Sequence, residues 1–190
     1  MKEKFIDIID ENEEIIDVLK PNTKKFWWNI GIRLFFITAF FNALVILMVF
    51  GVYSDGGFSD LRSVWMTIFI AGGISLLIVL FVILLASLAF QKRYYAYSNK
   101  RILIRSGVIG VDFKVLEYKL LGAMTVNVNV IDKMLGGKTG SIRFGSASSP
   151  IIGFHGGGPR AAMNAFAFNH VEKPYGLLRA IKTAIAKEEK

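Results

Sequence analysis

Two glycine-rich motifs are the first places in this chain where the residue types could perform chemistry. Gly136-Gly137-Lys138-Thr139 is similar to the end of a phosphate-binding loop, in which backbone N–H groups and a lysine hold nucleotide phosphates. The complete motif requires a glycine six residues before the lysine, but Asp132 stands there. It also requires a following helix, whereas the next residues are patterned as a strand. We therefore expect turn glycines between a short helix and a strand, and no nucleotide site.

The second motif, His155-Gly156-Gly157-Gly158, copies the oxyanion-stabilising segment of some lipases and esterases. Such an enzyme also needs a Gly-x-Ser-x-Gly nucleophile motif and a later catalytic histidine. The sequence has no such serine motif, and His170 is its only other histidine. Two isolated histidines and no cysteine give no spacing typical of metal ligands. We expect a non-enzymatic protein with no catalytic residues, no metal and no cofactor.

The remaining groups that could bind a ligand are cations. Residues 91–190 contain 16 Lys and Arg against 6 Asp and Glu, while residues 1–25 contain 5 Lys against 7 acidic residues. A basic domain beside a bilayer can contact anionic headgroups, each well-placed cation contributing about 1 kcal/mol. The alternative is a solvated basic surface on the cytoplasmic side. The candidate lipid- or partner-binding residues are those nearest the apolar segment: Lys92, Arg93, Lys100, Arg101 and Arg105. Nucleic-acid binding is not expected, because no nucleic-acid motif is present.

Two apolar segments precede this basic region. Residues 64–90 carry no formal charge, and about 20 such residues suffice to cross a hydrocarbon core as a helix. The first apolar segment follows Phe26-Trp27-Trp28, an aromatic cluster typical of a membrane interface. We predict transmembrane spans at about 28–53 and 64–90, joined by a short polar turn. Residues 26–93 would thus form a helical hairpin, residues 1–25 an N-terminal cytoplasmic segment, and the first span is not a cleaved signal peptide.

Polar and small residues inside the spans predict how the two helices pack. Asn42 lies near the middle of the first span, where we expect a hydrogen bond to the partner helix rather than a ligand. Thr67, Ala71 and Ser75 form a stripe of small residues on the second span. Such a stripe permits close approach of a second helix, either the first span or that of a second copy in a homo-oligomer.

The distribution of basic residues predicts the orientation. The polar turn contains only Arg62, whereas the basic residues Lys20, Lys24, Lys25 and Arg33 lie before or just inside the first span, and Lys92 and Arg93 follow the second. Because cytoplasmic loops are enriched in Lys and Arg, both termini are expected in the cytoplasm. The protein would be a multi-pass component of the cytoplasmic membrane.

After Arg93 the hydrophobic pattern becomes alternating. Strands are predicted around the tight turn Ser98-Asn99-Lys100-Arg101 and in several glycine-punctuated runs up to Asn169. Pro174 suits the first turn of a closing amphipathic helix, and residues 94–190 therefore form one domain of about six or seven strands and a helix. Ile15–Leu19 is compatible either with a helix or with a strand added to that domain. No flexible linker separates the second span from Tyr94, so the domain should be held close to the bilayer in a restricted pose.

Several motifs together resemble the bacterial pleckstrin-homology-like, membrane-flanked domain family. They are Glu13-Glu14-Ile15-Ile16 with Lys20-Pro21, the run from Tyr94 to Ile104 with Ser106-Gly107, and Ile131-Asp132-Lys133-Met134-Leu135-Gly136. The resemblance implies an α+β membrane protein in which a PH-like antiparallel β-barrel or sandwich is capped by the C-terminal helix. In PH-like barrels the first strand-turn-strand often forms the headgroup pocket, so by resemblance Lys100 and Arg101 are the best candidates. The alternative is that they cap a tight turn and that Lys92 and Arg93 are topological anchors.

The resemblance also implies a binding or scaffolding role without an activity. We expect a membrane-anchored module that presents its basic domain to anionic lipid or to a protein partner. The alternative is a structural subunit of a homo- or hetero-oligomeric membrane complex.

Overall fold

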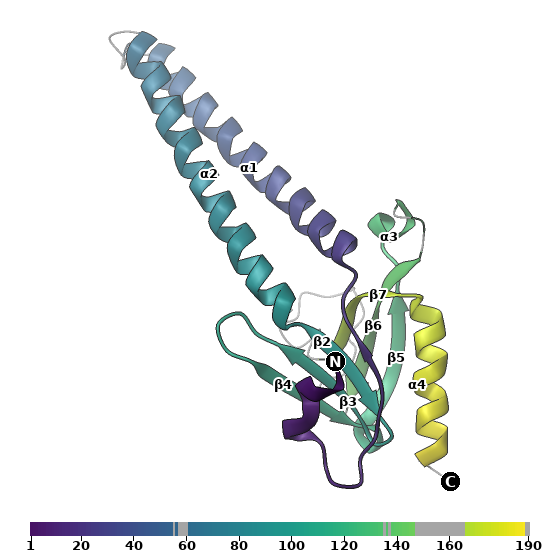
Figure 1. Ribbon diagram of the computed structural model, residues 1–190. Coiled ribbons are helices and arrows are strands. Elements are labelled where there is room, and N and C mark those ends of the chain that lie inside the picture. The colour runs from purple at the N-terminus through teal and green to yellow at the C-terminus, as the bar shows by residue number, and fades with distance from the viewer. Residues whose placement is uncertain (55, 57–60, 135, 137, 147–165, 189–190) are drawn as a thin grey trace. The chain divides into compact units, whose positions relative to one another are not determined.

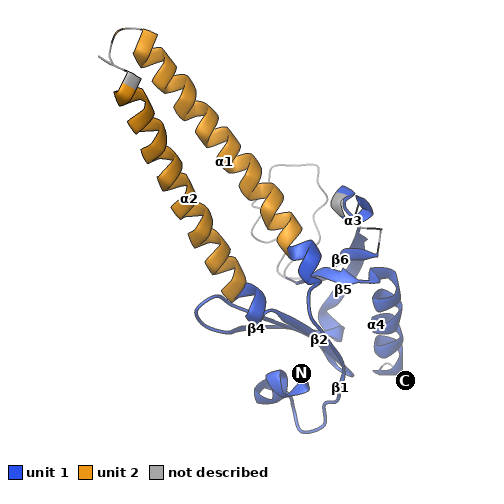
Figure 2. Ribbon diagram, turned by 45° about the horizontal axis from the view of Figure 1, so that its top comes forward, with its two compact units in different colours: residues 1–26, 89–190 blue, residues 27–88 orange. Residues whose placement is uncertain are grey.

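The computed structural model describes residues 1–54, 56, 61–134, 136, 138–146 and 166–188. The His155–Gly158 motif lies outside these residues. The chain divides into two compact units: residues 27–88 form one, and residues 1–26 together with 89–190 form the other (Figure 2). The second unit is therefore assembled from both ends of the chain.

Two helices carry the predicted spans. Helix α1 comprises Thr23–Ser54 and helix α2 comprises Leu61–Lys92. Both are long and apolar enough to cross a membrane, and only 6% of the most apolar window of each is buried. The core helix of a soluble protein would be mostly buried, so these faces have no protein cover among the described residues. The helices are confirmed where the hydropathy predicted them.

The polar residue in the middle of α1 contacts the other helix of the hairpin. Asn42 Nδ2 donates to the Thr38 carbonyl at 2.8 Å and reaches Ser75 Oγ at 3.5 Å. Ser75 is buried, whereas Gly72 and Gly73 beside it are exposed. One member of the predicted small-residue stripe is therefore used inside the hairpin.

The larger unit contains two antiparallel sheets (Figure 1). The first sheet has the order β1-β2-β3-β4, formed by Ile15–Leu19, Tyr94–Ser98, Arg101–Ser106 and Asp112–Glu117. The second has the order β5-β6-β7, formed by Leu121–Asn127, Thr139–Ser146 and Ala167–Glu172. The remaining elements are 3-10 helices η1 (Lys2–Ile8) and η2 (Tyr118–Leu120) and helices α3 (Val130–Met134) and α4 (Pro174–Glu188). The sheets are hydrogen-bonded separately, so the barrel is not closed.

Strand β1 settles the alternative left open for the N-terminal segment. Ile15–Leu19 is a strand that pairs with β2, with Leu19 opposite Tyr95. Two neighbouring strands of one sheet are thus connected through α1 and α2 rather than through a turn. The N-terminal residues are an integral part of the domain, and the helical hairpin is an insertion in it.

The central strands β2 and β3 are buried on both faces of the first sheet, and their alternating side chains point into two different clusters. Tyr95, Tyr97, Ile102 and Ile104 point into the main core, which they share with side chains of the second sheet and of α4. The α4 face consists of Leu177, Ile181 and Ala184. On the opposite face, Tyr94, Ala96 and Leu103 pack against Phe5 of η1 and Ile15 of β1. This second cluster explains why a short charged N-terminal segment is ordered.

The connection between α2 and the sheet is as short as predicted. Helix α2 ends at Lys92 and β2 begins at Tyr94, leaving Arg93 alone between them. Because β1 precedes α1 by three residues, the domain is joined to the hairpin by two short connections. The restricted pose of the domain beside a bilayer stays a prediction.

Candidate basic–aromatic binding site

The five predicted binding residues lie at opposite ends of β2. Lys92 and Arg93 directly precede the strand, and Arg105 of β3 is opposite its first residue, Tyr94. Lys100 and Arg101 lie at the other end, in and after the two-residue turn to β3. Five residues of strand span about 15 Å, so one headgroup cannot contact both groups. The structure therefore divides the predicted set into two sites.

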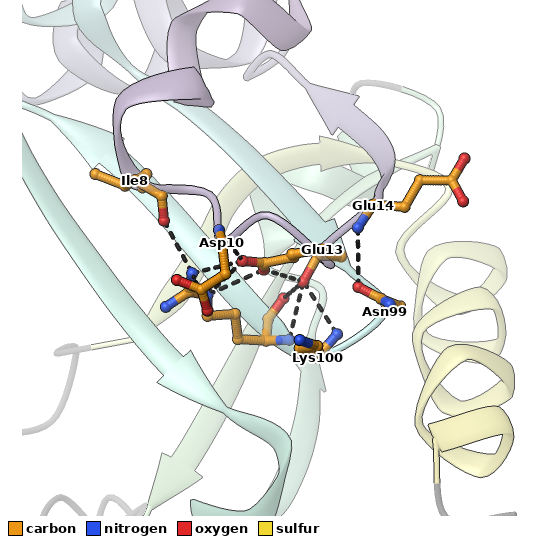
Figure 3. Close-up of polar contacts among 8 residues, drawn as sticks. Ile8, Asp10, Glu13, Glu14, Asn99 and Lys100 are labelled. Atoms are coloured by element: carbon orange, nitrogen blue, oxygen red, sulfur yellow. Dashed lines mark hydrogen bonds and ion pairs between the residues drawn. The ribbon is translucent and has the colours of Figure 1, made fainter.

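At the turn, Arg101 is held by acidic residues of the N-terminal segment. Figure 3 shows two of these, Asp10 and Glu13, beside Asn99 and Lys100 of the turn. The Arg101 Nε donates to both carboxylate oxygens of Glu13 at 2.9 Å, and its Nη2 donates to the Ile8 carbonyl at 2.9 Å. Asp10 adds an ion pair at 3.1 Å. Ser98 Oγ also donates to Glu13, at 2.5 Å. Burial acts to raise the pKa of Glu13, but the hydrogen bonds from Arg101 and Ser98 outweigh it, and the pKa lies below its ordinary value.

The Arg101 guanidinium is therefore bound within the protein, by the Glu13 carboxylate, the Ile8 carbonyl and Asp10. Asn99 completes the turn, because its Oδ1 accepts from the Glu14 N–H at 3.1 Å and its own N–H donates to the Glu14 carbonyl. The Glu-Glu motif and the Asn-Lys-Arg turn, which are 85 residues apart, thus form one network. The sequence supplied both motifs but gave no sign that they meet.

The structure also changes the reason for choosing Lys100 and Arg101. The family resemblance favours these two residues because it places them in the first strand-turn-strand of a PH-like sheet. With β1 in place, the first connection of the sheet is the helical hairpin, and the Asn99-Lys100 turn is the second connection. That turn opens at the end of β2 away from α2. Lipid binding at Lys100 and Arg101 stays a prediction without this support.

At the α2 end of β2, cations face aromatic rings instead of carboxylates. Lys4 Nζ lies 3.7 Å from the centre of the Tyr94 ring, and Lys20 Nζ lies 5.1 Å from that of Phe90. The Arg93 guanidinium lies 5.8 Å from the Phe26 ring, and that of Arg105 lies 6.0 Å from both Tyr94 and Phe113. Among the described residues no ion pair joins these cations to a carboxylate. We call Lys4, Lys20, Lys92, Arg93 and Arg105, with Phe26, Phe90, Tyr94 and Phe113, the basic–aromatic cluster.

The positive charge of the cluster affects the pKa of its one phenol, that of Tyr94. The neighbouring Lys4 ammonium lowers the pKa of Tyr94, and this outweighs the opposite effect of burial. In Tyr95, Tyr97 and Tyr118, burial raises the pKa instead. Tyr94, the first residue of β2, therefore lies in a positive electrostatic field that a bound anion would weaken.

The β3–β4 loop lies beside the cluster and is apolar at its tip. Lys92 Nζ donates to the Ile109 carbonyl and, at 3.2 Å, to the Gly110 carbonyl. Ile109 is 91% exposed, with Val108 and Val111 half-exposed on either side. The turn is tight, because a Cβ at Gly107 (φ 140°) would collide with the Gly110 oxygen. The loop presents an isoleucine to solvent beside Lys92, the last residue of α2.

The Gly136–Thr139 motif has the structural role expected of it. Helix α3 precedes it and strand β6 follows, so no helix starts where a phosphate-binding loop would need one. Asp132, at the position that argued against the motif, is fully buried and pairs with Lys25 at the start of α1. Thr139 Oγ1 donates to it at 2.6 Å. Burial acts to raise the pKa of Asp132, but these contacts hold it below its ordinary value.

Comparison with known families identifies the chain. A family model described as a bacterial PH domain matches residues 34–180, more than three quarters of the sequence. The chain belongs to the bacterial PH domain family. No curated protein and no solved structure matches it. The bacterial PH domain match begins inside α1, so it includes most of the hairpin but not β1. Family membership supports a binding or scaffolding module and assigns no ligand.

Two features of this bacterial PH domain protein escaped the sequence analysis. Lys4 and Lys20 of the basic–aromatic cluster come from the N-terminal segment, whose net negative charge gave no reason to choose them. No role was predicted for the exposed Ile109, which lies between Gly107 and Gly110. An apolar residue between two glycines after a strand was the available signal. Among the described residues, no group of three or more His, Cys, Asp or Glu could hold a metal ion.

Proposed function

We propose that this protein is an integral membrane binding module whose basic–aromatic cluster contacts the anionic surface of the cytoplasmic leaflet. The observation that carries the proposal is the set of cations without carboxylate partners where α2 runs into β2. The apolar part of α2 ends at Phe90, and the first charged residues after it, Lys92 and Arg93, already belong to the cluster. Covalent continuity alone therefore keeps the cluster near the end of the span.

The composition of the cluster fits a membrane interface. Aromatic residues are enriched at headgroup level, and basic residues there are attracted to anionic lipids by about 1 kcal/mol each. Ile109 adds an apolar tip beside Lys92, which suits shallow insertion between headgroups. More Lys and Arg lie around the start of α1 (Lys20, Lys24, Lys25) and the end of α2 (Lys92, Arg93) than in the turn, which has only Arg62, and this distribution supports the cytoplasmic orientation.

The absence of cysteine allows a direct test with the full-length chain. Ile109→Cys labelled with an environment-sensitive fluorophore should emit at shorter wavelength when the protein is reconstituted in phosphatidylglycerol-containing bilayers than in phosphatidylcholine alone. The effect should decrease at about 1 M salt, where the Debye length is about 3 Å. A label at Lys187→Cys, in the last turn of α4, is the matched control and should emit as in water. Water-like emission from position 109 in both bilayers would contradict the proposal.

A further inference from the structure

A second basic site lies outside the basic–aromatic cluster, in a cavity of about 200 Å³. It is formed by the link between β1 and α1, the start of β6, and the connection between β7 and α4. Its lining residues are Asn22, Lys24, Lys138, Thr139, Glu172 and Lys173. Because about 10–15 Å³ holds one water, the cavity has room for a phosphate group with some hydration.

The walls of the cavity are fixed by hydrogen bonds between its three segments. The Lys173 N–H donates to the Lys138 carbonyl at 2.7 Å, and the Asn22 N–H donates to the His170 carbonyl at 2.6 Å. Asn22 Nδ2 also donates to Glu172 Oε1 at 2.7 Å. The backbone therefore holds Lys138 and Lys173 side by side without help from a ligand.

The charges of the cavity are unbalanced. Three lysines and one carboxylate are among its lining residues, and that carboxylate, Glu172, already accepts a hydrogen bond from Asn22. Among the described residues no ion pair involves Lys24, Lys138 or Lys173. The adjacent Lys25 differs, because it is buried and paired with Asp132. The fold neutralises the lysine that it buries and leaves a net charge of +2 around the cavity.

The backbone at Lys173 supports a role for its side chain. Its φ is +45°, in the left-handed region where a side chain is unfavourable and glycine is not. Glycine would serve the turn between β7 and α4 better if only the backbone mattered. Non-glycine residues in this conformation occur disproportionately at functional sites.

The place of Lys24 in the chain puts the cavity close to the headgroup region. Lys24 is in the first turn of α1, four residues before Trp28, and four helical residues rise about 6 Å. Trp27 and Trp28 are the residues expected at the membrane interface. A phosphate just outside the hydrocarbon core is therefore within reach of this side chain.

We infer that this cavity binds a single phosphate group with an uncompensated negative charge, held by Lys24, Lys138 and Lys173. An anionic phospholipid headgroup and free inorganic phosphate share this chemistry. The inference goes beyond the proposed function, on which it rests only for the level of the cavity relative to the membrane.

The experiment uses the full-length protein in nanodiscs and has two arms. In the lipid arm, nanodiscs contain phosphatidylcholine with or without phosphatidylglycerol, and native mass spectrometry counts the retained lipids. In the soluble arm, inorganic phosphate is titrated into phosphatidylcholine nanodiscs, and the melting temperature is measured with chloride at equal ionic strength as the reference. The variants are Lys138→Gln and Lys173→Gly, and Lys182→Gln on the exposed face of α4 is the charge-matched control.

We expect Lys138→Gln and Lys173→Gly each to weaken binding about fivefold in the arm that shows it, with Lys182→Gln unchanged. Lys173→Gly should not lower the melting temperature, because it relieves the left-handed backbone, so weaker binding cannot be attributed to unfolding. Retention of phosphatidylglycerol identifies a lipid headgroup as the source, and a melting shift with phosphate alone identifies the free anion. Equal behaviour of cavity and control variants, or no binding in either arm, overturns the inference. If Arg105→Gln lowers lipid retention while the cavity variants do not, the proposed function stands and the cavity inference fails.

Discussion

Both ends of β2 carry cations, and the two ends differ in what those cations face. At the β2–β3 turn, Arg101 faces Glu13 and Asp10 and is 16% exposed. At the α2 end, Lys4, Arg93 and Arg105 face aromatic rings. An arginine that donates to a buried carboxylate must break those bonds to bind an anion, whereas a cation on a ring keeps its charge available. The partner of a basic residue, more than its position in a motif, decides whether it can bind.

Removing the Glu13 carboxylate at the β2–β3 turn should have the largest effect on stability. Glu13→Gln leaves Arg101 with a neutral partner at a buried position, and the free energy of unfolding should fall by about 2–3 kcal/mol. Thermal unfolding of the full-length protein in detergent, followed by circular dichroism, measures the change. Glu14→Gln is the matched control, because only the backbone of Glu14 contacts the turn; it should change stability by less than about 0.5 kcal/mol. Equal effects of the two variants would show that Glu13 is not the partner that matters.

Acid should destabilise the domain where a buried carboxylate is paired with a cation, as at Glu13 and Asp132. The pKa of Glu13 lies below its ordinary value of 4.5, and that of Asp132 lies below 3.8. A carboxylate with a lowered pKa in the folded state contributes stability that is complete above its ordinary pKa and is lost as pH falls through the folded value. The melting temperature should therefore be nearly constant down to about pH 5 and decrease at lower pH. Glu13→Gln should flatten this decrease; an unchanged slope would assign the acid sensitivity to other carboxylates.

Charge removal at the two ends of β2 should affect lipid binding unequally. Arg105→Gln should weaken association with phosphatidylglycerol about fivefold, because one basic residue near the surface contributes about 1 kcal/mol. Lys100→Gln, the matched change at the turn, should have little effect. Retention of phosphatidylglycerol by the reconstituted protein measures both, and 1 M salt should reduce the difference. A larger effect from Lys100→Gln would restore the turn as the binding site.

Much of the fold was predictable because its signals are local. A run of about 27 apolar residues favours a long helix whatever its neighbours, and α1 and α2 lie where hydropathy predicted them. Strand-like runs on either side of Ser98-Asn99-Lys100-Arg101 likewise predicted β2, β3 and the turn between them. Helix α4 begins at Pro174 as expected and buries Leu177 and Ile181.

The features that were not predicted depend on contacts between distant residues. The choice between helix and strand for Ile15–Leu19 is made by its pairing with β2, whose register matches Leu19 to Tyr95 across the whole hairpin. No periodicity within five residues contains that information. The same holds for Glu13 and Arg101, whose bidentate contact joins positions 88 residues apart. The candidate residues were predicted as one basic set, which the structure divides between the two ends of β2, and ligand binding by any of them stays a prediction.

The smallest expected effect concerns the phenol of Tyr94, which reports the charge of the basic–aromatic cluster. Lys4 lowers the pKa of Tyr94, whereas burial raises that of Tyr97 near the turn. Subtracting the ultraviolet titration of Tyr94→Phe from that of the parent protein isolates the Tyr94 transition. Adding phosphatidylglycerol to the bilayer should raise this pKa, because a nearby anion disfavours the phenolate, and phosphatidylcholine should leave it unchanged. If the Tyr94 transition is the same in both bilayers, anionic lipid does not reach the first residue of β2. The two ends of the strand would then differ in structure but not in lipid binding.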